Sequence, residues 1–421
     1  MLEQILSILK ENQIKKYTIA QNKIEAAELY LIKDKVNMHR TKEKELYSLT
    51  VYNDFTQDNV EYTGSANVEL YPSMDKEELT AAIKDAYFAT QFVKNKRYDI
   101  ADGEKAELAL ASTEKSLQDI MFEVKDALYT NDRIGNGLVN SAEIFVTKNN
   151  ARKVTSKGAD VKYTSYKISG EFISQWKEQN DVELYNSFSY DNLDAADLAL
   201  KVKEAIEDAG YRDKAIEPVK TGKYNVVIKD SSVIEFLSYY VAASNAGQIY
   251  RKLSSAAIED KIQGENVTGD KLNVTVTSSV PFNAEGIRLV DRTLIEDGVL
   301  KLITGPTQYM QYLGLEPIGG YNELKVQGGS VTYDDILEEG DLFILRFSDF
   351  QSDPVTGDFG GEIRLALLKQ NGKLVPFTGG SLNANTKEVQ ESMILSKELQ
   401  KDGANVVPKA IKFKDIQISG K

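Results

Sequence analysis

Cysteine is absent from the 421 residues of the chain, and histidine and tryptophan occur once each. Without cysteine there can be no disulfide bond, thiolate zinc site, iron–sulfur cluster or cysteine nucleophile. A single histidine cannot form a two-histidine metal site. That residue, His39, lies in the charged stretch NMHRTKEKE, where we expect a solvated surface position rather than a catalytic one.

Basic surface and long apolar runs are also scarce. The 51 lysines and arginines are outnumbered by 64 aspartates and glutamates, for a formal net charge of −13. This balance argues against nucleic-acid binding, because phosphates attract basic surfaces. The longest uncharged apolar-leaning run, Phe236 to Tyr250, is shorter than the roughly 20 residues that span a bilayer. The opening residues, MLEQILSILKENQ, lack the basic region of a signal peptide, so we expect a cytoplasmic protein with no membrane or nucleic-acid partner.

Two pairs of segments repeat at a spacing of 114 or 115 residues. VELYPSMDKEELTAA (68–82) matches VELYNSFSYDNLDAA (182–196), and AAELYLIKDK (26–35) matches SAEIFVTKNN (141–150). A repeat this long indicates a duplicated subdomain rather than a solenoid, whose units have ~20–50 residues. Each copy joins alternating strand patterns to an amphipathic helix, and the helix of the second copy is predicted to end at Gly210.

Beyond about residue 214 the pattern changes to strands and turns. EDG (296–298) and QNG (370–372), each between apolar runs, predict tight hairpins. We therefore predict an α+β fold in which duplicated α/β subdomains precede a β-rich antiparallel domain. The predicted boundaries are 1–213 for the N-terminal domain, divided into about 1–130 and 131–213, and 214–421 for the C-terminal domain.

Motifs for independent catalysis are missing. The sequence has no G-x-S-x-G elbow, no P-loop and no G-x-G-x-x-G after a strand. The stretch SDFQSDPVTGDFGGE holds four acids that could offer oxygen ligands to a hard cation: Asp349, Asp353, Asp358 and Glu362. Their spacing matches no EF-hand loop. Acids that simply form turns are the alternative, since aspartate favours turns.

Two blocks resemble the TldD/PmbA family, also called modulator of DNA gyrase. VTGDFGGEIRLALLKQNGKLVPFTGGSL (355–382) resembles the family's C-terminal signature, in which a T-G-D-F-S turn precedes a glycine-rich strand, an N-G hairpin and a closing strand. VPFNAEGIRLVDRTLIEDGVLKLITGPTQYMQYLG (280–314) resembles a second block, with Asn283 where the family usually has aspartate. The order of a duplicated α/β half and a β-rich half also agrees with this family.

The resemblance implies a metallopeptidase-like fold with two branches. TldD-like members carry an H-E-x-x-x-H zinc helix, and PmbA-like (TldE) members lack it. By position, this motif would fall at Leu237 to Ala243, which reads LSYYVAA and offers none of the usual zinc ligands. The sequence is therefore similar to the PmbA/TldE-like branch, with no cofactor expected. Tyr239 and Tyr240 would be vestigial metal-helix positions, or residues that simply pack in the core.

The resemblance further implies a non-catalytic chain that acts with a TldD-like zinc peptidase, or as a homodimer, on unfolded peptide during peptide maturation or proteolysis. A homo-oligomeric peptide-binding scaffold and a metal-dependent hydrolase using the C-terminal acids are the alternatives. The candidate peptide-binding or functional turn comprises Thr356, Gly357, Asp358, Phe359, Gly360 and Gly361. A tight turn without function is the other interpretation, because glycine supplies the φ angles that turns need.

Overall fold

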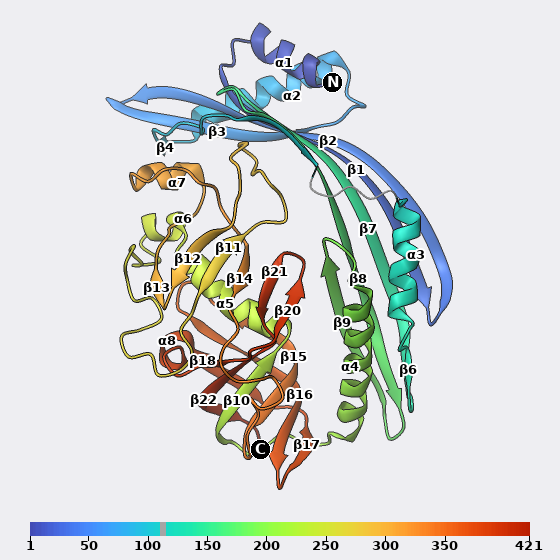
Figure 1. Cartoon of the computed structure of the whole chain (residues 1–421). Helices are drawn as coiled ribbons and strands as arrows, with labels where there is room; N and C mark the ends of the chain where they lie inside the picture. Colours follow the sequence, from blue (N-terminus) through green and yellow to red (C-terminus); the bar gives the residue numbers. More distant parts are fainter. Residues whose placement is uncertain (110–114) are drawn as a thin grey trace.

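The N-terminal half of the chain builds one strongly curved sheet of nine strands (Figure 1). The structure is a computed structural model that describes residues 1–109 and 115–421. The strands are β1 (Lys16–Ile32), β2 (Lys35–Gln57), β3 (Val60–Leu70), β4 (Asn95–Lys96), β5 (Lys105–Ala109), β6 (Arg133–Ile134), β7 (Gly137–Thr155), β8 (Asp160–Lys177) and β9 (Asp181–Tyr190). The helices of this half are α1 (Leu2–Glu11), α2 (Lys76–Ala89), η1 (Thr90–Phe92), α3 (Leu117–Leu128) and α4 (Ala195–Lys214).

The sequence repeat appears as two copies of the order helix, three long strands, helix. The copies are α1-β1-β2-β3-α2 and α3-β7-β8-β9-α4, and they join through the antiparallel pairing of β1 with β7. In that pairing Leu29 lies opposite Ile144, its own counterpart in the repeat. The two copies are therefore related by a local two-fold axis at this residue pair. The expected boundary near residue 130 places helix α3 in the first copy. In the structure, α3 packs in one core with α4 and β7 of the second copy.

Helix α4 continues through Gly210, where it was predicted to end, as far as Lys214. The glycine at this position is explained by a close contact with the only tryptophan of the chain. A Cβ built on Gly210 would lie 3.1 Å from the ring of Trp176. Gly137 approaches the same ring, with a built Cβ 2.6 Å away. These glycines serve packing against an aromatic ring rather than helix termination.

The C-terminal half contains two further sheets, and its strands are mostly antiparallel, as predicted. One sheet consists of β10 (Gly222–Lys229), β15 (Leu342–Ser352), β16 (Asp358–Gln370), β17 (Lys373–Phe377), β18 (Ser381–Asn385), β19 (Ile394–Leu395) and β22 (Ala410–Ser419). The other consists of β11 (Val274–Thr277), β12 (Arg292–Glu296), β13 (Val299–Leu300), β14 (Glu323–Val326), β20 (Leu399–Asp402) and β21 (Asn405–Pro408). The helices are α5 (Ser231–Ala243), α6 (Ala246–Tyr250), α7 (Thr307–Tyr312) and α8 (Thr386–Val389).

A ring of strands surrounds the main core of this half. Pairing of β10 with β22 closes the path β10-β15-β16-β18-β22 on itself. Phe236 of α5 packs into this core, with its ring centroid 5.1 Å from that of Phe359 and 4.8 Å from that of Phe413. Both predicted hairpins are confirmed: β12 and β13 meet at Asp297–Gly298, and β16 and β17 at Asn371–Gly372, all four residues with positive φ.

The apolar segment at 231–250 forms two helices, α5 and α6. Helix α5 ends at Ala243, and the side chain of Asn245 accepts a hydrogen bond from the Gly247 amide at the start of α6. No helix in residues 1–109 and 115–421 is long and apolar enough to cross a membrane.

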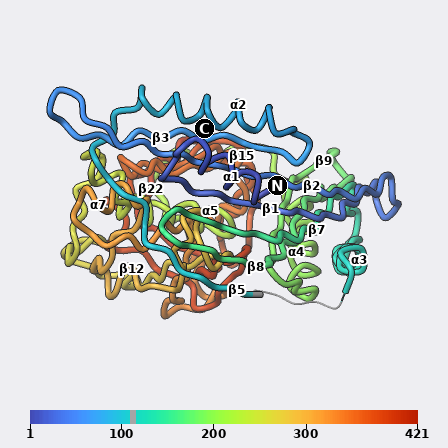
Figure 2. Tube along the Cα trace, turned by 90° about the horizontal axis from the view of Figure 1, so that it is seen from above, coloured from blue at the N-terminus to red at the C-terminus, as the bar shows by residue number. Residues whose placement is uncertain are grey.

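The two halves contact one another at more than one place (Figures 1 and 2). At one end, the side-chain amide of Gln311 exchanges two hydrogen bonds with the backbone of Asp99, at 2.8 and 2.9 Å. At the other end, α4 and β9 face the β10–α5 junction, β15 and β20. The second contact encloses the cavity described next.

Candidate functional site

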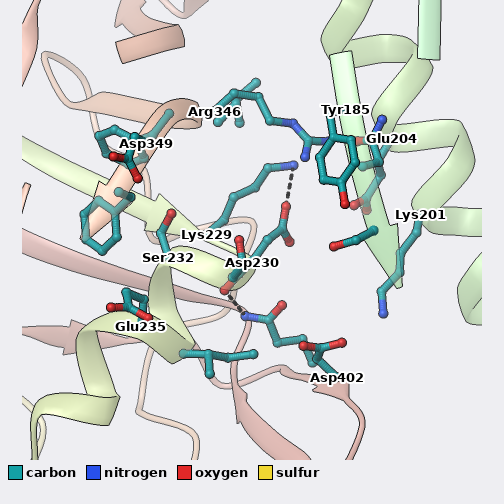
Figure 3. Close-up of a pocket in the computed structure, with 18 of the residues that line it drawn as sticks. Tyr185, Lys201, Glu204, Lys229, Asp230, Ser232, Glu235, Arg346, Asp349 and Asp402 are labelled. Carbon is teal, nitrogen blue, oxygen red and sulfur yellow. Dashed lines mark hydrogen bonds and ion pairs between the residues drawn. The ribbon is translucent and has the colours of Figure 1, made fainter. Parts of the chain in front are cut away.

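A cavity of about 430 Å³ lies between the N-terminal sheet and the C-terminal half. Figure 3 shows Tyr185, Lys201 and Glu204 on one side of it, and Ser232, Glu235 and Asp349 on the other. The residues come from β8, β9 and α4 on the N-terminal side, and from the β10–α5 junction, β15 and β20 on the C-terminal side. No single element or domain forms this cavity alone, and most of its lining side chains are polar or charged.

The junction between β10 and α5 has an unusual backbone conformation. Asp230 has φ 56° and ψ −133°, values that residues with a Cβ rarely adopt and that cost of order 1–3 kcal/mol. Its carbonyl oxygen accepts a hydrogen bond from the Gln400 side chain at 3.0 Å, which supports the turn from β20. The helix therefore starts without a side-chain cap from Asp230, and its first residue is Ser231. This geometry turns the Asp230 carboxylate into the cavity (Figure 3).

A buried ion network joins the two halves behind this junction. Lys229 Nζ lies 3.5 Å from Asp208 Oδ2 of α4 and 3.3 Å from Asp230 Oδ2. Arg346 of β15 donates from Nε to the same oxygen of Asp208 at 2.9 Å. Burial works against charge on Asp230, but attraction to Lys229 and Arg346 outweighs it and holds the pKa of this carboxyl below its usual value. Burial likewise opposes charge on Lys229, and its two carboxylate neighbours raise its pKa above the ordinary lysine value.

The outer edge of β9 faces the cavity. β9 pairs with β8 on one side, and on the other side Ser189 accepts a hydrogen bond from the Gly403 amide at 2.9 Å. Backbone groups two residues apart point the same way in a strand, so those of Ser187 and Tyr185 also point outward. Both residues line the cavity, and Tyr185 is 61% exposed. An extended chain entering here would find free donors and acceptors in strand geometry.

The candidate turn at 356–361 lies outside this cavity but next to α5. Asp353 Oδ1 accepts from the amides of Val355 and Thr356, both at 2.8 Å, and Asn385 donates to Asp358 at 2.7 Å. Gly357 has φ +80°, and a Cβ built on it would lie 3.2 Å from the ring of Tyr239.

The remaining residues of this turn belong to β16. Phe359 is buried in the core, and a Cβ on Gly360 or Gly361 would lie 2.2 or 2.1 Å from a carbonyl oxygen of the neighbouring strand. Strand packing therefore requires glycine at both positions. Thr356 and Asp358 are exposed, whereas Gly357 and Phe359 are buried, and a role of this turn in peptide binding stays a prediction.

Comparison with known proteins shows which protein family the C-terminal half of the chain matches. Residues 221–420 match the family model described as PmbA/TldA metallopeptidase C-terminal domain. A protein named metalloprotease from Archaeoglobus fulgidus is 24% identical over 341 residues, which cover 74% of this chain and 73% of that protein. Residues 221–420 of this chain belong to the TldD/PmbA family.

Solved structures share the fold of this chain over its whole length. TldE from Thermococcus kodakarensis superposes with a TM-score of 0.77 at 15% identity, covering 99% of this chain and 100% of that one. A protein from Bacteroides thetaiotaomicron, described as a candidate modulator of DNA gyrase, gives a TM-score of 0.79 at 19% identity, covering 100% and 98%.

The family name implies a metal, which the side chains of α5 would have to bind. Ser238 donates its hydroxyl to the carbonyl of Glu235 at 2.7 Å. Tyr240 is fully buried and donates to Gln390 at 2.9 Å, and Tyr239 is 6% exposed. Across the described ranges, no three His, Cys, Asp or Glu side chains are grouped as metal ligands, the C-terminal acids included. The donors present on this helix do not fit a zinc ion.

The family resemblance led to α5 and the 356–361 turn, but not to the charged network beside them. Asp208, Lys229 and Arg346 are far apart in the sequence, and nothing in their neighbourhoods links them. One local signal was available: the apolar strand YNVVI ends in the two charges Lys229 and Asp230 directly before an apolar helix. Charged residues at the end of a buried strand need ion-pair or hydrogen-bond partners, and here those partners come from both halves of the chain. The single histidine, His39, is exposed on β2 and does not line this cavity.

Proposed function

We propose that this chain is a non-catalytic, peptide-holding member of the TldD/PmbA family that acts with a TldD-like zinc peptidase in peptide maturation or in the proteolysis of unfolded peptides. The observation that carries the proposal is the cavity between β9 and the β10–α5 junction, which presents a sheet edge at Tyr185 and Ser187. A sheet edge binds an extended chain through main-chain hydrogen bonds and so tolerates many sequences.

The chemistry of α5 supports the non-catalytic part of the proposal. Its side chains at 237–243 are committed to packing and to hydrogen bonds within the core, as Tyr240 with Gln390 illustrates. Peptide hydrolysis at a metal needs an open coordination position for water beside three protein ligands. The catalytic ligands would therefore come from the partner chain, and this chain would hold and present the peptide.

The partnership is tested by co-expression with a TldD-like chain that carries the H-E-x-x-x-H helix. We expect the two chains to co-purify, and the mixture to cleave an unfolded peptide faster than the TldD-like chain alone. Equal rates with and without this chain would refute the joint activity. A stable homo-oligomer that binds peptide but ignores the TldD-like chain would instead favour the scaffold alternative.

Binding through the sheet edge is tested on the ligand. A strand uses the N–H groups of alternate residues along each of its edges. A peptide N-methylated at every second residue keeps one edge intact and should bind, whereas the same peptide N-methylated at consecutive residues should not. Equal binding of both peptides, measured by fluorescence anisotropy, would show that main-chain pairing is not the mode of recognition.

A further inference from the structure

We propose that the cavity between β9 and the β10–α5 junction receives the cationic end of a lysine or arginine side chain from the bound peptide. This inference rests on the proposed peptide-holding function and adds the chemical class of side chain that the site selects. It follows from which charges around the cavity already have partners within the protein and which do not.

Three cations that line the cavity already have partners within the protein. Lys229 and Arg346 are held by Asp208 and Asp230, as described above. Lys201 lies 2.9 Å from Asp197 and donates to the carbonyl of Lys401 at 3.0 Å. These amino and guanidinium groups are therefore poorly placed to hold an anionic ligand.

Three carboxylates around the same cavity have no ion-pair partner among the described residues. Glu235 accepts only from the backbone amide of Ser352 at 3.3 Å, and Asp349 accepts from the Gln351 side chain at 2.9 Å. Asp402 makes no ion pair, and burial raises the pKa of its carboxyl despite the attraction of nearby lysines. Such a group gains from a cation that replaces its lost water.

The remaining lining charges do not alter this balance. Glu204 pairs with Lys409 at 2.9 Å, outside the set of free acids. Lys401 and Asp349 are both exposed and can keep their charges in water, so Glu235 and Asp402 are the half-buried free charges. The free charge directed at the cavity is thus negative, although both signs are present in the lining.

One polar side chain in the cavity wall also lacks a hydrogen-bond donor. The side chain of Asn186 on β9 is 6% exposed and lines the cavity. Its Nδ2 group donates to the Leu184 carbonyl at 2.9 Å and to Ser174 Oγ at 3.2 Å, but its Oδ1 atom has no hydrogen-bond partner. A buried amide oxygen without a donor is unfavourable, and an ammonium or guanidinium group bound beside Asn186 would be such a donor once a side-chain shift uncovers this oxygen.

The walls also suit the methylene stem that such a side chain carries. Phe347 and Phe350 of β15 lie in ring contact, with centroids 4.8 Å apart, and both line the cavity. Tyr185 exposes its ring from the opposite wall. Lysine and arginine bury their aliphatic stems against apolar surface while the charged end stays with polar groups.

The test uses the full chain and a set of fluorescent 12-residue peptides measured by anisotropy. The first peptide is unstructured, N-acetylated and carries one central lysine. The second has norleucine in place of lysine, which keeps the stem and removes the charge. The third is the norleucine peptide with a free amino terminus, so that it offers an ammonium group from the terminus alone.

We expect the lysine peptide to bind roughly fivefold more tightly than the norleucine peptide, and Asp402→Asn or Glu235→Gln to remove most of that preference. Glu107→Gln on β5, whose side chain is 78% exposed, is the matched control and should keep the preference. If the third peptide matches the lysine peptide, the terminus is the cationic source, and the side-chain assignment is overturned.

The outcomes separate this inference from the proposed function. Tight but equal binding of all three peptides would overturn the charge preference and leave peptide holding intact. A preference that survives both Asp402→Asn and Glu235→Gln would also overturn it, by placing the cation elsewhere. Failure of every peptide to bind would remove the proposed function and the inference together.

Discussion

Replacing Asp208 with asparagine tests whether the buried ion network holds the two halves together. Asp208 is 4% exposed and accepts from Arg346 while lying 3.5 Å from Lys229 Nζ. A pair of unit charges at this distance attracts by about 5 kcal/mol at an effective dielectric constant of about 20, and desolvation offsets much of that gain. Removing one partner leaves the other charges buried, which typically costs about 3–5 kcal/mol. Because Asp230 still neutralises part of the charge, we expect about 3 kcal/mol.

The assay is urea denaturation of the full chain followed by tryptophan fluorescence. With a denaturant slope of about 3 kcal/mol per molar, the expected loss lowers the urea midpoint by about 1 M. Glu207→Gln is the matched control, because Glu207 is the next residue of α4 and its pair with Lys203 is exposed, at 3.9 Å. That change should cost less than about 0.5 kcal/mol. If Asp208→Asn costs no more than the control, the reasoning from burial and charge is refuted.

Three further changes probe the junction, the tryptophan contact and α5. Gly137→Ala places a Cβ 2.6 Å from the Trp176 ring, so we expect a loss of about 1–3 kcal/mol and a shifted emission spectrum; unchanged emission would contradict the close contact. Tyr240→Phe removes the hydrogen-bond donor to Gln390 in the core, and we expect urea denaturation to show a loss of about 1–2 kcal/mol in the free energy of unfolding. No loss would show that this hydrogen bond does not stabilise the core. The pKa of Asp230 is lower in the folded chain than in the unfolded one, so its contribution to stability is present above the unfolded pKa and is lost as the pH falls through the folded pKa. We expect the free energy of unfolding to depend less steeply on pH below about pH 4 in Asp230→Asn than in the unaltered chain. The same pH dependence in both proteins would argue against the pairing of Asp230 with Lys229.

Local patterns in the sequence were sufficient for the fold class and the hairpins, because these depend on neighbouring residues. The Asp297–Gly298 and Asn371–Gly372 turns follow from the backbone preferences of their own residues. The break at Asn245 was not visible in the same way. Asparagine is acceptable inside a helix and also caps one, and only the contact of residue 245 with Thr304 in the folded chain decides between the two.

The cavity could not be derived from the sequence, because its parts are distant along the chain and depend on how the halves pack. Asp208 and Arg346 are 138 residues apart and meet only when α4 faces β15. A charged residue on a helix is usually solvated, so nothing marked Asp208 as buried before the fold was known. Gly210 illustrates the same limit: glycine near a helix end suggests a cap, whereas here it admits the ring of Trp176.

The duplication also shows why the strand that lines the cavity extends further past VELY in the second copy than in the first. VELY at 68–71 is followed by Pro72, and VELY at 182–185 is followed at the matching position by Asn186. Proline has no N–H to continue a strand ladder, and β3 ends at Leu70, whereas β9 continues to Tyr190. The residues gained by the second copy include Asn186 and Ser187, which line the cavity. One sequence difference between two related copies therefore ends the first strand early and extends the second into a wall of the candidate binding site.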